Sequence, residues 1–404
     1  MQSVLTDRVY CAPGNGGTGG LGRNIAIPAD DVVNLVKFAK TEKIGLVVLG
    51  PESAIAAGVG DALRDAGIPV FGPNRAAGRV ETSKAFAKEL MDRAGIPTAA
   101  WGVFTEADAA KAWARDHEGQ VVVKADGLAL GKGVIVCGSV AEAEEAIDSM
   151  LVAKAFGRAG ATVVVEERLE GAEVSLMAIT DGKRVIPLAP ARDFKRALEG
   201  DNGPNTGGMG AYSPPLGVTD DIIREAVEKI LEPAVRQLAE EGTEYRGLLY
   251  AGLMLTADGV RALEFNARFG DPEAQVVLPR LETDLVRVML EAARGDLGPV
   301  GDLDWNPRPC VGVVVASGGY PDSYETGFPI DGLATIPPGI QVFHAGTRFL
   351  PGSGLVTSGG RVFTIVALGS TVAEAREQAL AGVGRVRFSA AFHRHDIAQE
   401  AIGA

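Results

Sequence analysis

Cysteine, histidine and aromatic residues are scarce in this chain of 404 residues. It holds three cysteines and four histidines, and aromatic residues make up 6% of the sequence. Cys11, Cys137 and Cys310 lie too far apart for a CxxC pair and are too few for a disulfide scaffold, so we expect a reducing, cytoplasmic setting. The histidines show no zinc-binding spacing. A disulfide-stabilised scaffold and a conventional zinc centre are therefore excluded.

A long apolar run and an excess of positive charge are also missing. No stretch reaches the roughly 18 consecutive apolar residues of a membrane-spanning helix, and the opening residues lack the basic start and apolar core of a signal peptide. Lys and Arg total 39 against 52 Asp and Glu, a net charge of −13. Because nucleic acids and anionic membranes attract basic surfaces, we expect neither as a partner.

Glycine, by contrast, is abundant. The chain has 53 glycines among its 404 residues, roughly twice the ~7% of an average protein. With 46% hydrophobic and 23% charged residues, the composition is that of a folded globular protein whose length suits two or three domains. The excess of glycine indicates binding loops built from backbone groups.

Strands and helices alternate through the first third of the chain. Short β-branched runs at 8–12, 44–50 and 68–72 flank helical patterns at 30–42 and 52–66, and Gly67 stands where a helix C-cap glycine belongs. This rhythm predicts an α/β unit with a parallel sheet. A further helix is expected at 81–94.

A mixed α+β pattern follows. Residues 101–169 predict strand, helix, strand, glycine loop, strand, helix and strand, and longer strands are expected at 173–180 and 184–194. Residues 199–217 are too rich in glycine and proline for a regular element. The later elements are a helix at 219–241, paired strands turning at Asp258-Gly259, a helix ending near Arg294, a linker at 295–310 and a last mixed unit.

A lysine-bearing strand leads into a glycine hairpin at 122–134. The glycine spacing is not that of a Walker A loop, and Gly133 stands where a magnesium-binding Ser or Thr would be needed. Lys124 and Lys132 could nevertheless provide point charges for phosphates, while backbone N–H groups of the loop lie over them. A solvated hairpin with surface lysines remains the alternative.

The strand ending at Asn266 carries alternating polar side chains. Its period of two places Glu264, Asn266 and Arg268 on one face. A carboxylate and an amide oxygen suit Mg²⁺ held between protein and phosphates, and Arg268 is available for an anion. An exposed strand face would show the same alternation. The turn at 270–273, with two carboxylates, is consistent with capping or with function.

Two further glycine-rich segments call for interpretation. Residues 14–19 fit G-x-G-x-x-G after a strand, but the helix that should hold a phosphate is not expected there, which favours an ordinary surface loop. Residues 202–212 lack the Ser, Lys and Glu of a solvated spacer. We interpret them as a loop that cradles a substrate rather than as a linker.

The order of these motifs resembles that of the ATP-grasp ligases, through segments 83–86, 123–127, 131–133, 166–167, residue 173 and segment 264–266. More closely, nearly the whole chain resembles the phosphoribosylamine–glycine ligase family, also called glycinamide ribonucleotide synthetases. The segments that carry this likeness are 12–15, 48–52, 71–73, 203–212, 268–273, 318–321 and 344–347.

The resemblance implies a pre-ATP-grasp domain at 1–80, an ATP-grasp module of two subdomains at 81–295 with a lid near 100–168, and a small mixed C-terminal domain at 306–400. It implies a C–N ligase that joins glycine to 5-phosphoribosylamine through glycyl phosphate. The products would be glycinamide ribonucleotide, ADP and phosphate, in de novo purine biosynthesis. ATP with Mg²⁺ or Mn²⁺ would be needed, and a monomer is expected.

The resemblance also implies roles for single residues. Lys195, Arg268 and Asp193 would be catalytic, and Glu264 and Asn266 would bind the metal. The nucleotide would contact Lys84, Lys124, Gly127, Gly131, Lys132, Gly133, Glu166, Glu167, Leu169 and Glu173. The substrates would contact Asn205, Thr206, Gly207, Gly208, Met209, Gly210 and Asp271.

Three departures from the family pattern stand out. Phe194 replaces the usual His between Asp193 and Lys195, and Tyr250 stands near where other ATP-grasp enzymes have a second metal carboxylate. The family also opens with a strand and a Gly-Gly-Arg-Glu-His loop that this sequence lacks, so the parallel sheet should be without its first strand. Two alternatives to an active synthetase of this family therefore remain: an ATP-binding protein with little turnover, or another ATP-grasp carboxylate–amine ligase.

Overall fold

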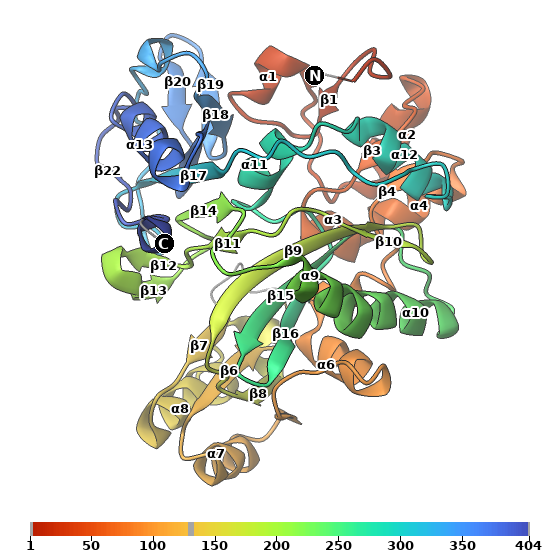
Figure 1. The fold of residues 1–404 in the computed structure, drawn as a ribbon, viewed down its shortest axis with the longest axis vertical. Helices are drawn as coiled ribbons and strands as arrows, with labels where there is room; N and C mark the ends of the chain where they lie inside the picture. The colour runs from red at the N-terminus through yellow and green to blue at the C-terminus, as the bar shows by residue number, and fades with distance from the viewer. Residues whose placement is uncertain (1–2, 128–132, 403–404) are drawn as a thin grey trace.

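A small α/β unit begins the computed structural model, which describes residues 3–127 and 133–402 (Figure 1). Its strands form two separate parallel pairs, β1 (Tyr10–Cys11) with β2 (Arg23–Asn24) and β3 (Val47–Val48) with β4 (Val70–Phe71). The parallel pairing confirms the predicted α/β class, although the expected single sheet is two short ribbons. The helices of this unit are α1 (Thr18–Leu21), α2 (Val32–Thr41), α3 (Glu52–Ala57) and α4 (Val59–Asp65).

Two expected helices are each divided in two. The helix predicted at 52–66 breaks at Gly58, whose φ of +83° is left-handed and ends α3 before α4 begins. The helix predicted at 81–94 is α5 (Arg79–Thr82) followed by α6 (Lys84–Arg93). Ser83 separates them, since its hydroxyl accepts a hydrogen bond from the Phe86 N–H and caps α6.

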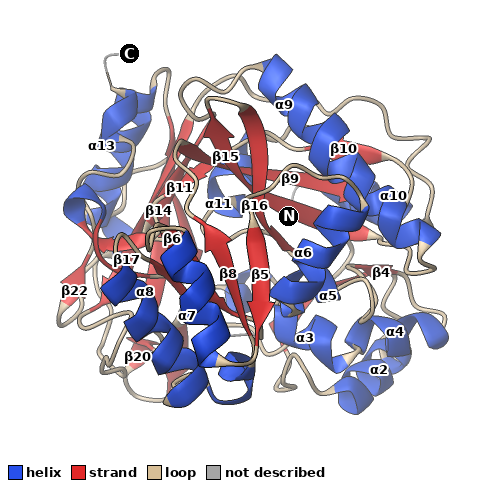
Figure 2. Cartoon of the chain, turned by 90° about the horizontal axis from the view of Figure 1, so that it is seen from below, coloured by secondary structure: helices blue, strands red, loops and turns tan. Residues whose placement is uncertain are grey.

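The segment predicted as the lid forms an antiparallel sheet with the strand order β5-β8-β6-β7, which we call the lid sheet. Its strands are β5 (Trp101–Phe104), β6 (Val121–Ala125), β7 (Val134–Val136) and β8 (Val163–Glu167). Helices α7 (Ala107–Asp116) and α8 (Val140–Ile147) pack against it, and α8 continues into a π-helical turn at Asp148–Val152 (Figure 2). The observed order of strands and helices confirms the order predicted from the sequence. The prediction succeeds here because each of these elements has its own local period of apolar residues.

A second antiparallel sheet, β10-β9-β15-β16, lies at the centre of the molecule (Figure 1). Its strands are β9 (Ala172–Thr180), β10 (Val185–Pro187), β15 (Gly247–Thr256) and β16 (Gly259–Asn266). The helix predicted at 219–241 comprises α9 (Asp220–Ala226), a π-helical turn at Val227–Leu231 and α10 (Glu232–Glu240). Its apolar face packs with this sheet and with α6 in one core that continues into the first unit.

The C-terminal sheet has the order β11-β14-β17-β21-β18, and β22 (Ala391–Phe392) also pairs with β17. Its other strands are β11 (Arg192–Asp193), β14 (Gly210–Ser213), β17 (Cys310–Ser317), β18 (Gln341–His344) and β21 (Arg361–Leu368). Helix α13 (Val372–Val383) packs on it, and β19 (Thr347–Leu350) and β20 (Gly354–Thr357) form a separate hairpin. Two strands of this sheet, β11 and β14, therefore come from the middle of the chain.

The sequence interpretation of residues 184–217 was wrong in two respects. The strand expected at 184–194 is divided between β10 of the central sheet and β11 of the C-terminal sheet. The segment judged too glycine-rich for regular structure contains β13 (Asn202–Asn205), which pairs with β12 (Arg196–Leu198), and β14. Pairing partners on β17, about a hundred residues away, stabilise β14, and such partners leave no local pattern.

The segment 295–310 is not a free linker. Leu297 and Val300 are buried in the core beside α12 (Leu285–Arg294), and Trp305 forms an isolated β-bridge with Leu281. The short helix α11 (Ala274–Val277) joins the same core. Within the described residues, no helix has the length and apolar character that crossing a membrane requires.

Candidate active site

Basic side chains from three parts of the fold surround Glu264 near the end of β16. Lys84 begins α6, Lys124 lies on β6 of the lid sheet, and Lys195 follows β11. Burial opposes ionisation of Glu264, but these lysines together with Arg268 outweigh it and lower the pKa of the carboxyl. Glu264 is therefore held as a carboxylate inside a cationic cluster, which is what a site for anions and a metal requires.

A buried lysine pair holds Glu166 at the end of β8. Lys88 Nζ lies 2.7 Å and Lys124 Nζ 2.6 Å from its carboxylate oxygens, and at most 7% of any of these side chains is exposed. Lys88 also donates to Thr98 Oγ1 at 2.7 Å, and burial lowers its pKa to about 8. The sequence reasoning missed Lys88, although it lies one helical turn after Lys84 and so shares its face.

Lys195 is paired with two carboxylates. Its ammonium contacts Glu173 and lies 3.5 Å from Asp193 Oδ1. Burial raises the pKa of Asp193 to about 7 against the opposing effect of Lys195. The structure thus brings Asp193, Lys195 and Glu173 together.

Phe194 points away from this group. Its ring is buried in the C-terminal core, 6.3 Å from the ring of Tyr212, and the guanidinium of Arg394 lies 5.2 Å from its centroid. Strand alternation places the flanking Asp193 and Lys195 on the other side. Phe194, which stands where the resemblance implies a histidine, thus occupies a position that contributes to packing.

Arg268 connects the central sheet to the first unit. Its Nε lies 3.3 Å from Glu81 Oε1 and 3.8 Å from Glu52 Oε2, and Glu81 Oε2 accepts a hydrogen bond from the Ala267 N–H at 2.7 Å. Burial raises the pKa of Glu81 to about 7. Neither glutamate was among the predicted site residues, because their approach to Arg268 depends on how the two units pack.

A buried hydroxyl network lies beside Asn266. The Tyr250 hydroxyl donates to Glu273 Oε1 at 2.8 Å and lies 2.8 Å from Ser175 Oγ, which donates to the same oxygen at 3.2 Å. Tyr250 is the cross-strand neighbour of Asn266. The departure seen at Tyr250 is thus a hydrogen-bonded support for a buried carboxylate.

The glycine loop that follows β13 packs directly on Lys195. The Thr206 N–H and hydroxyl both donate to the Lys195 carbonyl, at 2.7 and 2.8 Å, and the Thr206 hydroxyl accepts from the Gly208 N–H at 2.9 Å. Asn205 Nδ2 donates to the Val134 carbonyl of the lid at 3.2 Å. The loop therefore adjoins both the cationic cluster and the lid.

Comparison with known proteins agrees with this arrangement. Family profiles for the N, ATP-grasp (A) and C domains of phosphoribosylglycinamide synthetase match residues 1–81, 82–274 and 310–400. The phosphoribosylamine–glycine ligase of Allochromatium vinosum is 51% identical over 99% of this chain and 94% of its own length. The chain belongs to the phosphoribosylglycinamide synthetase family.

Other relatives of the synthetase family agree. The phosphoribosylamine–glycine ligase of Halalkalibacterium halodurans is 47% identical over 99% of this chain and 93% of its own length. The crystal structure of the Thermotoga maritima ligase superposes with a TM-score of 0.84 at 34% identity, covering 96% of this chain and 94% of that one. The chain is thus an ATP-grasp ligase, and the alternatives of a non-catalytic ATP-binding protein or a different ligase are not favoured.

The ATP-grasp fold extends beyond the synthetases. The biotin carboxylase domain of Hydrogenobacter thermophilus 2-oxoglutarate carboxylase, solved with MgADP, superposes with a TM-score of 0.70 at 17% identity. It covers 95% of this chain and 86% of that one. At this identity the likeness concerns the fold alone.

The donor set for a metal in the synthetase site is small. Across residues 3–127 and 133–402, no three His, Cys, Asp or Glu side chains are grouped as a metal site would group them. Glu264 and Asn266 offer one carboxylate and one amide oxygen. That set fits a magnesium-like ion which takes its remaining ligands from nucleotide phosphates and water.

The remaining predicted residues differ in their surroundings. The Gly127 N–H donates to the Ala159 carbonyl at 3.3 Å, and the Gly133 carbonyl accepts from the Ala125 N–H at 2.8 Å. Glu167 is exposed and Leu169 is partly exposed at the edge of the lid. Gly210 begins β14, and Met209 is fully buried in the C-terminal core, where it supports the loop from beneath. Gly131 and Lys132 lie outside the described residues.

Asp126 anchors the lid to α6. Its Oδ1 accepts hydrogen bonds from Ser83 Oγ at 3.0 Å and from the Ala85 N–H at 2.7 Å. These bonds connect the strand that carries Lys124 with the helix that begins at Lys84. Asp126 thus fixes the distance between two predicted phosphate ligands.

The fingerprint-like loop at 14–19 is held by the C-terminal unit. The Gly16 N–H donates to the Thr347 carbonyl at 2.9 Å, and Asn15 Nδ2 donates to the His344 carbonyl at 2.7 Å. A Cβ on Gly17 would lie 2.5 Å from the His344 ring. Gly16 and Gly17 therefore permit close packing between the two units, whereas Gly14 and Gly19 face Asn24 of their own unit. The short helix α1 (Thr18–Leu21), which was not expected from the sequence, begins within this loop.

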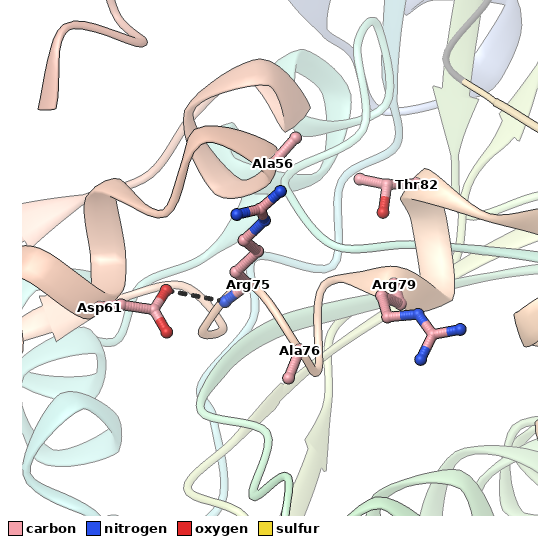
Figure 3. A pocket seen from close by; sticks show the side chains of 6 residues that line it. All are labelled: Ala56, Asp61, Arg75, Ala76, Arg79 and Thr82. Carbon is pink, nitrogen blue, oxygen red and sulfur yellow. Dashed lines mark hydrogen bonds between the residues drawn. The ribbon is translucent and has the colours of Figure 1, made fainter. Parts of the chain in front are cut away.

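A shallow cavity lies elsewhere in the first unit (Figure 3). It is lined by Ala56, Asp61, Arg75, Ala76, Arg79 and Thr82, and Asp61 Oδ2 accepts a hydrogen bond from the Arg75 N–H at 2.8 Å. Its lining contains none of the predicted site residues.

Proposed function

We propose that this chain joins glycine to 5-phosphoribosylamine with the conversion of ATP to ADP and phosphate, giving glycinamide ribonucleotide for de novo purine synthesis. The observation that carries the proposal is the convergence of Lys84, Lys124 and Lys195 on Glu264 beside the 203–210 loop. That arrangement suits the transfer of a phosphoryl group to a small acid.

The chemistry requires two steps. A carboxylate is a poor electrophile, so glycine first attacks the terminal phosphorus of ATP and becomes glycyl phosphate, with ADP leaving. The sugar amine then attacks the acyl carbon, and phosphate leaves. The protein contributes by positioning the reactants and by stabilising the charge that develops on the phosphoryl oxygens.

The cationic cluster would serve the nucleotide. Lys84 and Lys124 would contact the α- and β-phosphates, and Lys195 and Arg268 would stabilise the transferred phosphoryl group and the acyl phosphate. The Glu166 carboxylate is engaged by Lys88 and Lys124. Contacts with the adenine would therefore come from the backbone at the end of this strand and from the neighbouring Glu167 and Leu169.

The ribose, metal and substrate roles follow the same geometry. Glu173 would hold the ribose, and Glu264 with Asn266 would hold Mg²⁺ or Mn²⁺, which supplies charge neutralisation when bound. Asp193, ionised, would attract the glycine ammonium. The substrate loop, from Asn205 to Gly210, and Asp271 would enclose the ribosylamine. A monomeric, cytoplasmic enzyme without nucleic-acid partners completes the proposal.

Substrate dependence of ADP release tests the proposal. Purified protein with ATP and Mg²⁺ is expected to release ADP in step with turnover only when glycine and 5-phosphoribosylamine are both present. Alanine in place of glycine and ammonia in place of the sugar amine serve as matched controls. Efficient release with another acid and amine, and none with the proposed pair, would contradict it.

A further inference from the structure

The C-terminal unit contributes two side chains to the candidate substrate site. Arg361 is the first residue of β21, and Tyr320 follows β17. Both lie more than a hundred residues after the 203–210 loop that they contact. Neither was among the site residues expected from the sequence.

Arg361 connects the two loops assigned to the substrates. Its Nη1 donates to the Gly207 carbonyl and to the Asp271 carbonyl, each at 2.8 Å. Its Nη2 lies 3.0 Å from Asp271 Oδ2, which makes this a charge-assisted bond. One planar guanidinium therefore holds the 206–208 turn against the 270–273 turn.

Tyr320 holds the same turn from its other side. Its hydroxyl accepts a hydrogen bond from the Gly207 N–H at 3.0 Å, so both backbone groups of Gly207 are bound by the C-terminal unit. A Cβ on Gly207 would lie 2.9 Å from Arg361 Nη2. The absence of a side chain at Gly207 thus permits this close approach.

The contact has a functional consequence because Gly207 and Asp271 are exposed. Loops at a surface lose conformational freedom when they enclose a ligand, and this loss weakens binding. Side chains that hold both loops in place before the ligand binds remove part of this entropy loss. The Arg361 side chain is 20% exposed, so packing holds the guanidinium itself in place.

We propose that Arg361 is a positioning residue for substrate binding, and that with Tyr320 it couples the C-terminal unit to the ligase reaction. It acts through Gly207 and Asp271 and not on ATP. The proposal rests on the proposed function, since it takes the 205–210 loop and Asp271 as the substrate-binding loops.

Steady-state kinetics of Arg361→Ala and Arg361→Lys test the role. The KM for glycine, for ribosylamine or for both should rise about ten-fold, because misplaced loops lose productive geometry. The KM for ATP and nucleotide binding without the other substrates should stay unchanged. Lysine should not restore activity, because a single ammonium cannot bridge Gly207 and Asp271 as the fork does.

The exposed Arg348 on β19 offers a matched control in the same unit. Arg348→Ala should leave all three KM values unchanged. Tyr320→Phe, which removes one oxygen, should raise the same KM values as Arg361→Ala but by less. This variant also keeps the proposal testable if Arg361→Ala fails to fold.

A double-mutant cycle with Asp271→Ala separates positioning from a general loss of stability. If Arg361 acts through Asp271, the double variant should lose no more activity than the worse single variant. Additive losses, or substrate KM values that match those of Arg348→Ala, would overturn the proposal. If the unsubstituted enzyme releases no ADP with glycine and ribosylamine, the proposed function itself fails, which is a separate result.

Discussion

At the scale of single residues, the candidate site is governed by charge compensation. Glu166 lies between Lys88 and Lys124, and Glu264 is surrounded by lysines and Arg268. A carboxylate buried without such partners would be protonated, because desolvation disfavours the charged form. The cations therefore keep Glu264 ionised, as the proposed metal ligand must be, and the carboxylate in turn offsets the mutual repulsion of the lysines.

Glu264→Ala tests the assignment of the metal ligand. Removing this carboxylate should lower metal-dependent ADP formation by at least about 100-fold, since one electrostatic group of a reacting centre is lost. Glu240→Ala, at the exposed end of α10, is the control. Activity is measured by ADP release across a Mg²⁺ titration, and circular dichroism checks the fold. Wild-type activity in Glu264→Ala would refute the role.

The pH dependence of glycine use tests Asp193. Burial raises its pKa to about 7, so the carboxyl is neutral below that pH and ionised above it. Only the ionised form attracts an ammonium group, so kcat/KM for glycine should rise as pH increases through about 7. Asp193→Asn should lower kcat/KM for glycine about 100-fold and remove its rise with pH. Asp258→Asn, at an exposed turn, should keep the normal profile. Because Glu81 also has a pKa of about 7, the outcome that would exclude the role is an unchanged kcat/KM for glycine in Asp193→Asn.

At the scale of elements, the β12–β13 hairpin is anchored by Arg394, a residue that follows the last strand of the chain. Arg394, which follows β22, is buried and lies 2.9 Å from Asp201 and 2.7 Å from Asp396, while its Nη1 donates to the Arg196 carbonyl at 3.0 Å. The same guanidinium lies over the Phe194 ring. The hairpin leads directly into the substrate loop, so its anchoring by Arg394 sets where that loop begins.

Arg394→Met should loosen this hairpin. The substitution leaves Asp201 and Asp396 without their shared cation, but their side chains are 59% and 26% exposed and can be solvated, so we expect a loss of about 1 kcal/mol. We expect a lower midpoint of thermal unfolding and faster hydrogen–deuterium exchange at 196–205. The exposed Arg385→Met is the control. Unchanged exchange at 196–205 would show that the hairpin is stable without Arg394.

At the scale of the whole molecule, the C-terminal unit packs against the rest of the chain at several places (Figure 1). His344 and Thr347 hold the 14–19 loop of the first unit, and Arg361 holds the 206–208 and 270–273 turns. Strands β11 and β14 enter its sheet from the middle of the chain. The units are therefore joined by shared strands and hydrogen bonds rather than by free linkers.

Acidification should weaken the contact at His344. Burial lowers the pKa of this imidazole, so the folded chain keeps it neutral at pH values where the unfolded chain binds a proton. Because the unfolded state then binds more protons, stability falls as pH decreases below about 6.5. After correction for the intrinsic slowing of amide exchange at lower pH, protection against hydrogen–deuterium exchange at 14–20 should decrease between pH 7 and 5.5 relative to the amides of the β5-β8-β6-β7 sheet. His344→Gln should remove the difference, and an equal pH response in that variant would contradict the assignment.

The features that the sequence alone determined are those with a local cause. Apolar alternation placed Glu264, Asn266 and Arg268 on one face of β16, and the order of strands and helices in the lid followed from residue periods. The family could be recognised because its motifs are long and contiguous. Element ends were less accurate, since single residues such as Gly58 and Ser83 divide helices whose apolar pattern continues.

Only the tertiary structure decided which side chains meet. Lys88 with Glu166, Glu81 with Arg268, and Arg361 with Gly207 and Asp271 are each separated by many residues in sequence. Their pairing depends on how whole units pack, because burial then forces charged groups from distant parts of the chain to neutralise one another. No local sequence pattern reveals such pairs. For the same reason β14 forms a strand from a glycine-rich segment: β17, about a hundred residues later, supplies its hydrogen bonds.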